Sequence, residues 1–141
     1  MQREMYALSL SRPWAWAMFH GKNIENRNWR INYRGRIVIH ASQTWDPDGF
    51  LFLASHPDLL DANLPSPGGF PTGLIGELDI IDMVTASYSV WFFGPYGHIT
   101  ANAKEYNEPL TWPGKLGLFK VPTEILPTFA LPEQNFRLLK Q

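Results

Sequence analysis

The amino-acid sequence predicts an α+β fold: a small mixed β-barrel with two or more short flanking helices, in a single domain over residues 1–141. Runs with alternating apolar residues, typical of strands, recur along the chain. Two short segments begin with helix-start signals, and turns rich in Gly and Pro separate the runs. Many short strands with few helices favour a small barrel.

The first helix is expected over residues 13–20. Ser11 suits its N-cap, and Pro13 lies in its first turn, where the missing N–H is not needed. Gly21 offers a left-handed residue that ends it. The segment is mostly apolar and is expected to be buried, with Lys22 at its exit.

A second short helix is expected over residues 46–56, with Asp46 as its cap and Pro47 at its first position. Residues 59–72 are rich in Pro and Gly and predict a loop. Aromatic residues gather in 89–98, where Gly and Pro prevent a regular element. These rings either plug the end of a barrel or wall a pocket.

Six runs are expected to form strands, and an irregular C-terminal extension follows at 122–141. In the run 73–84, alternation places Ile75 on the same face as Glu77, and Leu74 on the other face with Leu78. Residues 32–35 and 111–114 are expected to be turns. The strand runs are 6–10, 24–31, 36–41, 73–84, 99–110 and 117–121.

Composition excludes several classes of protein. The chain has no Cys, which excludes disulfides, thiolate metal sites and a Cys nucleophile. No apolar run reaches the roughly 18 residues of a membrane span, and the N-terminus lacks the apolar core of a signal peptide. We therefore expect a cytoplasmic protein without a membrane partner, metal or cofactor. Aromatics make up 14% of the residues, so some rings are expected to line a pocket.

The stretch from Lys22 to Arg36 is the most basic part of the chain, with five basic side chains and one acidic one. Trp29 and Tyr33 lie among these charges. Cations can hold phosphates and rings can stack on bases, so the stretch indicates a nucleic-acid or nucleotide ligand. A solvated basic hairpin with packing aromatics fits the same composition. The net charge of −1 restricts nucleic-acid binding to a local patch.

Alternation also places pairs of charged residues on one face. Glu25 and Arg27 are two residues apart, so they point the same way and can form an ion pair. A carboxylate in the middle of a strand, at Glu77 or Asp79, is costly unless it is paired or faces a cavity. His40 ends the most strand-like run, where a lone His is more often structural than a ligand.

Several motifs are spaced between about residue 6 and residue 121: Leu8-Ser9-Leu10, Pro13-Trp14-Ala15-Trp16, Lys22-x-x-Glu25-x-Arg27, Trp29-Arg30-x-Asn32-Tyr33-Arg34-Gly35, Ile39-His40-Ala41-Ser42, Gly73-x-x-Gly76, Trp91-Phe92-x-Gly94-Pro95-x-Gly97 and Gly114-Lys115-x-Gly117-Leu118-Phe119. Together they resemble the ASCH domain family, whose PUA-like fold is a small β-barrel with flanking helices. The family signature is G-x-K-x-x-E-x-R. Here Gly21 lies directly before Lys22, one residue later than in the signature.

The resemblance implies that RNA or a nucleoside binds in a cleft beside the first helix. Some members resembling this chain are amidohydrolases that remove the acyl group from N4-acetylcytidine, one reported activity is metal-dependent RNA cleavage, and others are nucleic-acid-binding modules. In the amidohydrolase branch the motif Lys, here Lys22, acts with a Thr and a Glu. The Thr falls where this chain has Glu25, and Glu77 is the candidate for the Glu.

The first hypothesis is binding of RNA or of a modified nucleoside or nucleotide. The expected site is a positively charged slot at the end of the first helix, roofed by the loop around Trp91. Cations would contact phosphate or a base edge, and rings would stack on a splayed base. The candidate binding residues are Trp14, Trp16, Arg27, Trp29, Arg30, Tyr33, Arg34, His40, Ser42, Trp91, Phe93 and Tyr96.

The alternatives are catalytic or structural. For an amidohydrolase the catalytic candidates are Lys22, Glu25 and Glu77. Arg27 would lower the pKa of Lys22, and Glu25 would raise it. A metal-independent ribonuclease would need an acid–base pair, for which the chain offers Lys22, Tyr33, His40 and Ser42. In a structural interaction domain, Glu25 and Arg27 would merely pair and the Trp residues would be core.

Overall fold

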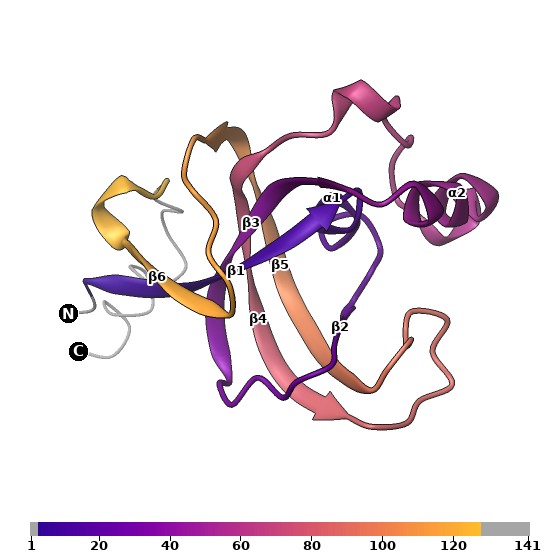
Figure 1. The fold of residues 1–141 in the computed structure, drawn as a ribbon, viewed down its shortest axis with the longest axis horizontal. Helices are drawn as coiled ribbons and strands as arrows, with labels where there is room; N and C mark the ends of the chain where they lie inside the picture. The colour runs from indigo at the N-terminus through magenta and orange to yellow at the C-terminus, as the bar shows by residue number, and fades with distance from the viewer. Residues whose placement is uncertain (1–2, 128–141) are drawn as a thin grey trace, which may run out of the picture.

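The computed structural model describes residues 3–127, which fold into strands with a few short helices (Figure 1). No helix among the described residues is both long enough and apolar enough to cross a membrane. The elements are β1 Glu4–Arg12, α1 Trp14–Ala17, β2 Ile24–Arg27, β3 Gly35–Trp45, α2 Pro47–Ser55, η1 Pro57–Leu59, η2 Pro67–Gly69, β4 Gly73–Val84, β5 Tyr96–Leu110, β6 Leu118–Pro122 and η3 Thr123–Ile125, where η marks a 3₁₀ turn.

The strands form one mixed sheet in the order β2-β5-β4-β3-β1-β6. β1 and β3 are parallel, and the other neighbours are antiparallel. β2 and β6 are the two edges and do not pair with each other in the described part of the chain, so the sheet is not closed into a barrel. The α+β class with short helices is confirmed.

β4 and β5 are long and strongly curved (Figure 1). Their pairing is interrupted by three register shifts, and β-bulges of this kind bend a strand and increase its twist. The shifts overturn the strict alternation expected for residues 73–84. Ile75 packs in the same hydrophobic cluster as Leu78, whereas Leu74 packs in a different one.

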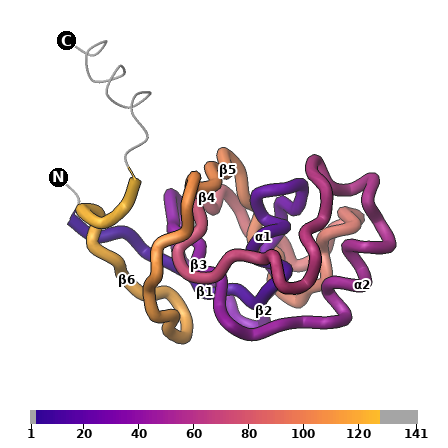
Figure 2. Tube along the Cα trace, turned by 90° about the horizontal axis from the view of Figure 1, so that it is seen from above, coloured from indigo at the N-terminus to yellow at the C-terminus, as the bar shows by residue number. Residues whose placement is uncertain are grey.

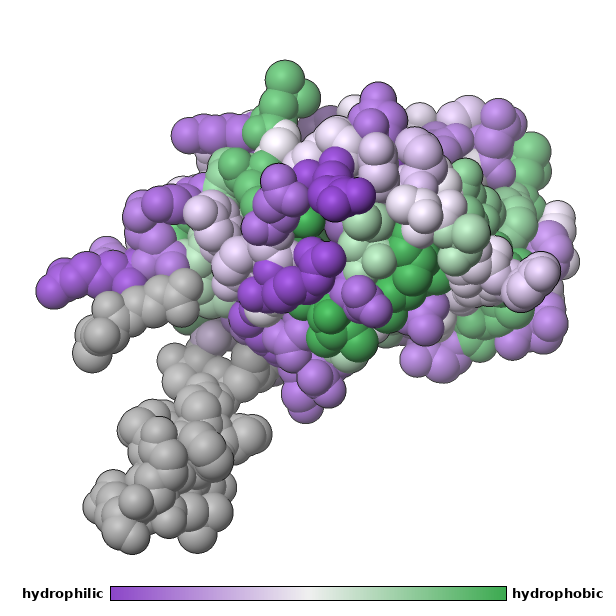
Figure 3. Space-filling model, turned by 90° about the horizontal axis from the view of Figure 1, so that it is seen from below, coloured by the Kyte–Doolittle hydropathy of each residue, from purple (hydrophilic) through white to green (hydrophobic). Residues whose placement is uncertain are grey.

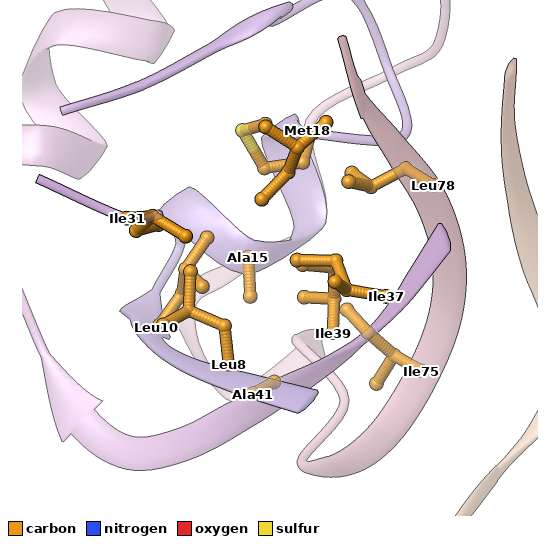
Figure 4. Packing of buried hydrophobic residues seen from close by; sticks show 11 residues of the cluster. Leu8, Leu10, Ala15, Met18, Ile31, Ile37, Ile39, Ala41, Ile75 and Leu78 are labelled. Carbon is orange, nitrogen blue, oxygen red and sulfur yellow. The ribbon is translucent and has the colours of Figure 1, made fainter. Parts of the chain in front are cut away.

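The main core lies between α1 and the sheet (Figure 4). Ala15 and Met18, which come from α1 and its C-cap, face apolar side chains from β1, β3 and β4. Burying one such Leu or Ile side chain stabilises the fold by about 1.5–3 kcal/mol. The sheet residues of this cluster are Leu8, Leu10, Ile37, Ile39, Ala41, Ile75, Leu78 and Ile80.

Two further hydrophobic clusters lie at opposite ends of the molecule. One includes Phe119 and Val121 of β6, and the other packs α2 and the 91–92 segment against α1. Figure 2 shows β6 and α2 at the two ends, with α1 between them. Seen from below, hydrophobic residues lie among hydrophilic ones (Figure 3). The large apolar side chains that stay exposed include Tyr88, Phe93 and Leu116.

Both predicted helices exist, but the first is short and its N-cap is Pro13 rather than the predicted Ser11, which lies in β1. Its α-helical part covers only Trp14–Ala17, because the amides of Phe19 and His20 donate to carbonyls three residues back, which tightens the chain into turns. Gly21 ends this segment as expected, with a φ of +126°. α2 matches the prediction, and the Asp46 side chain accepts a hydrogen bond from the Gly49 amide at 3.0 Å.

The strand expected over residues 24–31 ends at Arg27, and an irregular segment covers residues 28–34. β2 pairs with β5 only from Ile24 to Arg27. Beyond that point the Ile31 amide donates to the side chain of His98 on β5 rather than to the backbone of a neighbouring strand. The expected C-terminal extension begins with η3, and residues 128–141 lie outside the described part of the chain.

Candidate functional site

A cavity of about 510 Å³ opens where β1, β2 and β3 meet α1 and the 91–94 segment. We call it the lysine cavity. Its lining carries two cations and two carboxylates, so the slot has no formal net charge and the expected excess of positive charge is absent. The lining residues are Ser9, Leu10, Ser11, Trp14, Lys22, Glu25, Asn26, Arg27, Ser42, Thr44, Asp46 and Phe93.

Lys22 lies at the bottom of this cavity and is 3% exposed. Its Nζ donates to the carbonyl of Ile24, contacts Met18 Sδ at 3.6 Å and lies 5.5 Å from the centre of the Trp14 ring. Burial lowers the pKa of the Lys22 ammonium, Glu25 opposes that effect, and Arg27 adds slightly to it. Of the two opposing influences that the sequence left open, Glu25 outweighs Arg27, but the effect of burial on the pKa of Lys22 is larger than either.

Glu25 lies between the two cations. Its Oε1 is 3.7 Å from Lys22 Nζ, and its Oε2 is 2.9 Å from Arg27 Nε. The second contact is an ion pair without hydrogen-bond geometry, because Arg27 Nε makes no hydrogen bond. Another nitrogen of the same guanidinium donates to the Ser9 carbonyl at 2.8 Å, and Trp29 lies beneath it at 5.7 Å. Arg27 is therefore held on three sides at the cavity wall.

His98 fixes the backbone behind Glu25. It is completely buried, its Nδ1 lies 3.1 Å from the Glu25 carbonyl, and the Ile31 amide donates to its Nε2 at 3.0 Å. A carbonyl only accepts and an amide only donates, so the ring must carry its proton on Nδ1 and stay neutral. Burial lowers the pKa of His98 in agreement with this arrangement.

Asn26 attaches residues 91–94, which we call the aromatic loop, to β2. Its Oδ1 accepts from the amides of Phe93 at 2.8 Å and Gly94 at 3.0 Å, and its Nδ2 donates to the Trp91 carbonyl at 3.0 Å. Through these bonds Phe93, 53% exposed, takes its place at the cavity rim. Trp91 is only 5% exposed and packs against Phe52, so it belongs to the core.

Trp14 forms the aromatic wall. Its Nε1 donates to Asp46 Oδ2 at 2.7 Å, and Phe93 meets its ring edge-on at 5.8 Å. This hydrogen bond and the one from the Gly49 amide lower the pKa of Asp46. The helix cap predicted for Asp46 thus also orients the indole, and both aromatic faces of the cavity are fixed by polar contacts.

The structure brings some predicted site residues together and separates others. Lys22, Glu25, Arg27, Trp14 and the predicted binding residues Ser42 and Phe93 line the lysine cavity, and His40 lines an adjoining one. The remaining binding candidates do not line either cavity. Trp16 and Trp91 are buried in the core, Trp29 lies under Arg27, and Arg30 lies over Tyr96. Tyr33 donates a hydrogen bond to the Arg36 carbonyl, and Arg34 donates to the Ile31 and Tyr33 carbonyls.

Glu77 does not join Lys22. Its Oε1 pairs with Arg36 Nε at 3.2 Å and its Oε2 accepts from the Tyr106 hydroxyl at 2.8 Å, while Arg36 also pairs with Asp79 at 3.3 Å. These partners meet the predicted condition for carboxylates in mid-strand. Burial, followed by the neighbouring Glu77 charge, raises the pKa of Tyr106. The carboxylate next to Lys22 is Glu25.

Sequence reasoning missed several residues of the lysine cavity. Ser9 and Ser11 lie on β1 and Thr44 lies on β3, and only the pairing of these two strands brings them together at the cavity. Asn26 carried one available signal, because it lies inside the Lys22-x-x-Glu25-x-Arg27 motif. Among residues 3–127, no three His, Asp or Glu side chains gather in a way that could hold a metal ion.

No family model matches the chain, and no curated protein matches it either.

Replacing Asn26 by Ala should release the aromatic loop. The Phe93 and Gly94 amides lose their acceptor, and a typical intramolecular hydrogen bond contributes about 0.5–1.5 kcal/mol. Hydrogen–deuterium exchange should show lower protection at these two amides. Asn28→Ala, at an exposed position in the same segment, is the matched control. Unchanged protection in Asn26→Ala would contradict this role.

Stability should fall in mild acid because of His98. Its pKa in the fold lies below the value of about 6.5 that it has in an unfolded chain. Between these two pKa values the unfolded chain binds more protons, so the free energy of unfolding decreases as pH drops below about 6.5. Urea unfolding between about pH 7.5 and pH 5 measures the slope, and His98→Gln should flatten it. An NMR titration that finds an ordinary pKa at His98 would refute the assignment.

Proposed function

We propose that this chain binds a nucleoside or nucleotide, free or within RNA, as an ASCH-type domain with a PUA-like fold. The observation that carries the proposal is the lysine cavity itself, in which Lys22, Glu25 and Arg27 of the family signature meet two aromatic walls. The mixed six-stranded sheet with short helices beside it supports the α+β class of such a fold, and the sheet is open where the family has a barrel.

The charge balance of the cavity favours a nucleobase rather than a phosphate group as the part that is buried. Lys22 and Arg27 are countered by Glu25 and Asp46, so a phosphate would meet two carboxylates. A base edge carries both donors and acceptors, which match a carboxylate, a guanidinium and an amide. Trp14 and Phe93 supply ring surface for stacking. The sugar and any phosphate would then extend past Arg27 toward the cavity mouth.

Nucleoside binding should depend on Phe93 and Arg27 and not on Arg30. Loss of stacking costs roughly 1–3 kcal/mol per base, so Phe93→Ala should weaken binding about five- to 150-fold. Titration of the four nucleosides and their 5′-monophosphates, followed by NMR, measures this. Arg30→Met is the matched control for Arg27→Met, because Arg30 is exposed and lies outside the cavity. Equal losses in the two Arg variants, or no binding by the wild type, would sink the proposal.

A second candidate function is removal of the acyl group from N4-acetylcytidine, and burial of Lys22 favours it. A Lys can act as base or nucleophile only when its amine is neutral, and burial lowers the pKa of Lys22 in that direction. Glu25 would be the carboxylate partner in this chain, since Glu77 is paired with Arg36 and Tyr106.

On that candidate function, Lys22→Met should abolish release of acetate from N4-acetylcytidine, and Glu25→Gln should slow it. Glu77→Gln should leave turnover unchanged once the fold is verified by circular dichroism, because Glu77 does not line the cavity. Chromatography of the nucleoside products measures the rate. Full turnover by Lys22→Met would exclude this chemistry, as would an inactive wild type.

A further inference from the structure

A second cavity, of about 560 Å³, adjoins the lysine cavity and shares Ser9, Arg27, Ser42 and Thr44 with it. We call it the histidine cavity. Ser9 and His40 lie on neighbouring strands, and the segment between β5 and β6, which includes Trp112 and Gly114, covers them. Among residues 3–127, its lining contains Arg27 and Lys115 and no carboxylate, so it differs in charge from the lysine cavity.

Ser9 and His40 form a hydrogen-bonded pair in this cavity. Ser9 Oγ lies 2.9 Å from His40 Nδ1, and His40 Nε2 lies 2.7 Å from the Trp112 carbonyl. A carbonyl only accepts, so in the neutral ring the proton is on Nε2 and Nδ1 has a free lone pair. The Ser9 hydroxyl then donates to Nδ1. This is the arrangement of an activated nucleophile: a hydroxyl, a base within hydrogen-bond reach, and a third group that orients the base.

Gly114 packs closely against the pair. A Cβ at this position would lie 2.7 Å from His40 Cε1, 2.9 Å from His40 Nδ1 and 3.0 Å from Ser9 Oγ, closer than a side chain tolerates. Because Gly114 has no side chain, the segment between β5 and β6 can lie against the pair. Ser9 lines both cavities, whereas His40 is buried and lines only the histidine cavity.

A cation lies next to the same serine. An Arg27 guanidinium nitrogen donates to the Ser9 carbonyl at 2.8 Å, and Arg27 lines both cavities. Attack of a hydroxyl on an acyl carbon creates negative charge on the carbonyl oxygen, and a fixed cation beside it stabilises that charge.

We propose that Ser9 and His40 form a hydrolytic dyad for small carboxylic esters, with Ser9 Oγ as nucleophile and His40 Nδ1 as base. This activity goes beyond base binding in the lysine cavity and does not require it. Ser9 Oγ bonds to the acyl carbon while its proton passes to His40 Nδ1. The bond from the acyl carbon to the alcohol oxygen breaks, and His40 returns the proton to that oxygen. Water then attacks the acyl carbon and gives a proton to His40 Nδ1. The bond from the acyl carbon to Ser9 Oγ breaks, His40 passes that proton to Ser9 Oγ, and the carboxylic acid leaves.

The test uses the full chain with p-nitrophenyl acetate as the ester. Wild type should release p-nitrophenol in turnover, and peptide mapping should find the transient acetyl group on Ser9. Ser9→Ala and His40→Gln should each lower the rate by about a hundredfold or more, the usual size of a general-base contribution. Ser66→Ala is the matched control, because Ser66 is exposed and its side chain caps no helix.

Two further measurements keep the outcome decisive. Thermal unfolding verifies that each variant folds. Ser9→Ala retains the backbone carbonyl to which Arg27 donates, so nucleoside binding should persist in this variant. Loss of ester hydrolysis with unchanged nucleoside binding therefore separates the two proposals. A Ser9→Ala rate equal to wild type, or acetyl groups found only on lysines such as Lys115, would overturn the dyad.

Discussion

The charge balance of the lysine cavity depends on the Glu25 carboxylate. It is the anion shared by Lys22 and Arg27, both of which point into the same small space. Without it, a buried ammonium and a half-buried guanidinium would repel each other with little water to screen them. His98 holds the Glu25 backbone from behind, so the carboxylate is positioned by β5 as well as by β2. A charged site is thereby built on the edge strand of a sheet.

The sheet topology explains why the two cavities are neighbours. β1 lies between β3 and β6, so the end of β1 reaches the lysine cavity while the segment that leads into β6 covers the histidine cavity. α1 closes the apolar side of the sheet and also supplies Trp14, which helps to wall the lysine cavity. The same short segment therefore serves the core and the site, which explains its density of Trp and Ala.

Local signals in the sequence were sufficient for much of the fold. The Asp46–Pro47 start, the left-handed Gly21 and the β-branched run of β3 each act over a few residues, and the structure has them as predicted. Features that depend on distant partners were not predictable. The bulges of β4 arise from its pairing with β5, and the aromatic loop exposes Phe93 rather than Trp91 because Asn26 bonds its backbone. Strand alternation correctly put Glu25 and Arg27 together, yet it could not bring Ser9 to them.

The position of Arg27 in the wall between the cavities has a thermodynamic consequence. One guanidinium contacts Glu25 on one side and the Ser9 carbonyl on the other. A molecule that draws this group toward itself in one compartment alters the energy of occupancy in the other, and linkage requires the reverse effect to be equal. The binding free energies of two ligands, one in each cavity, would thus be coupled through the Arg27 side chain alone.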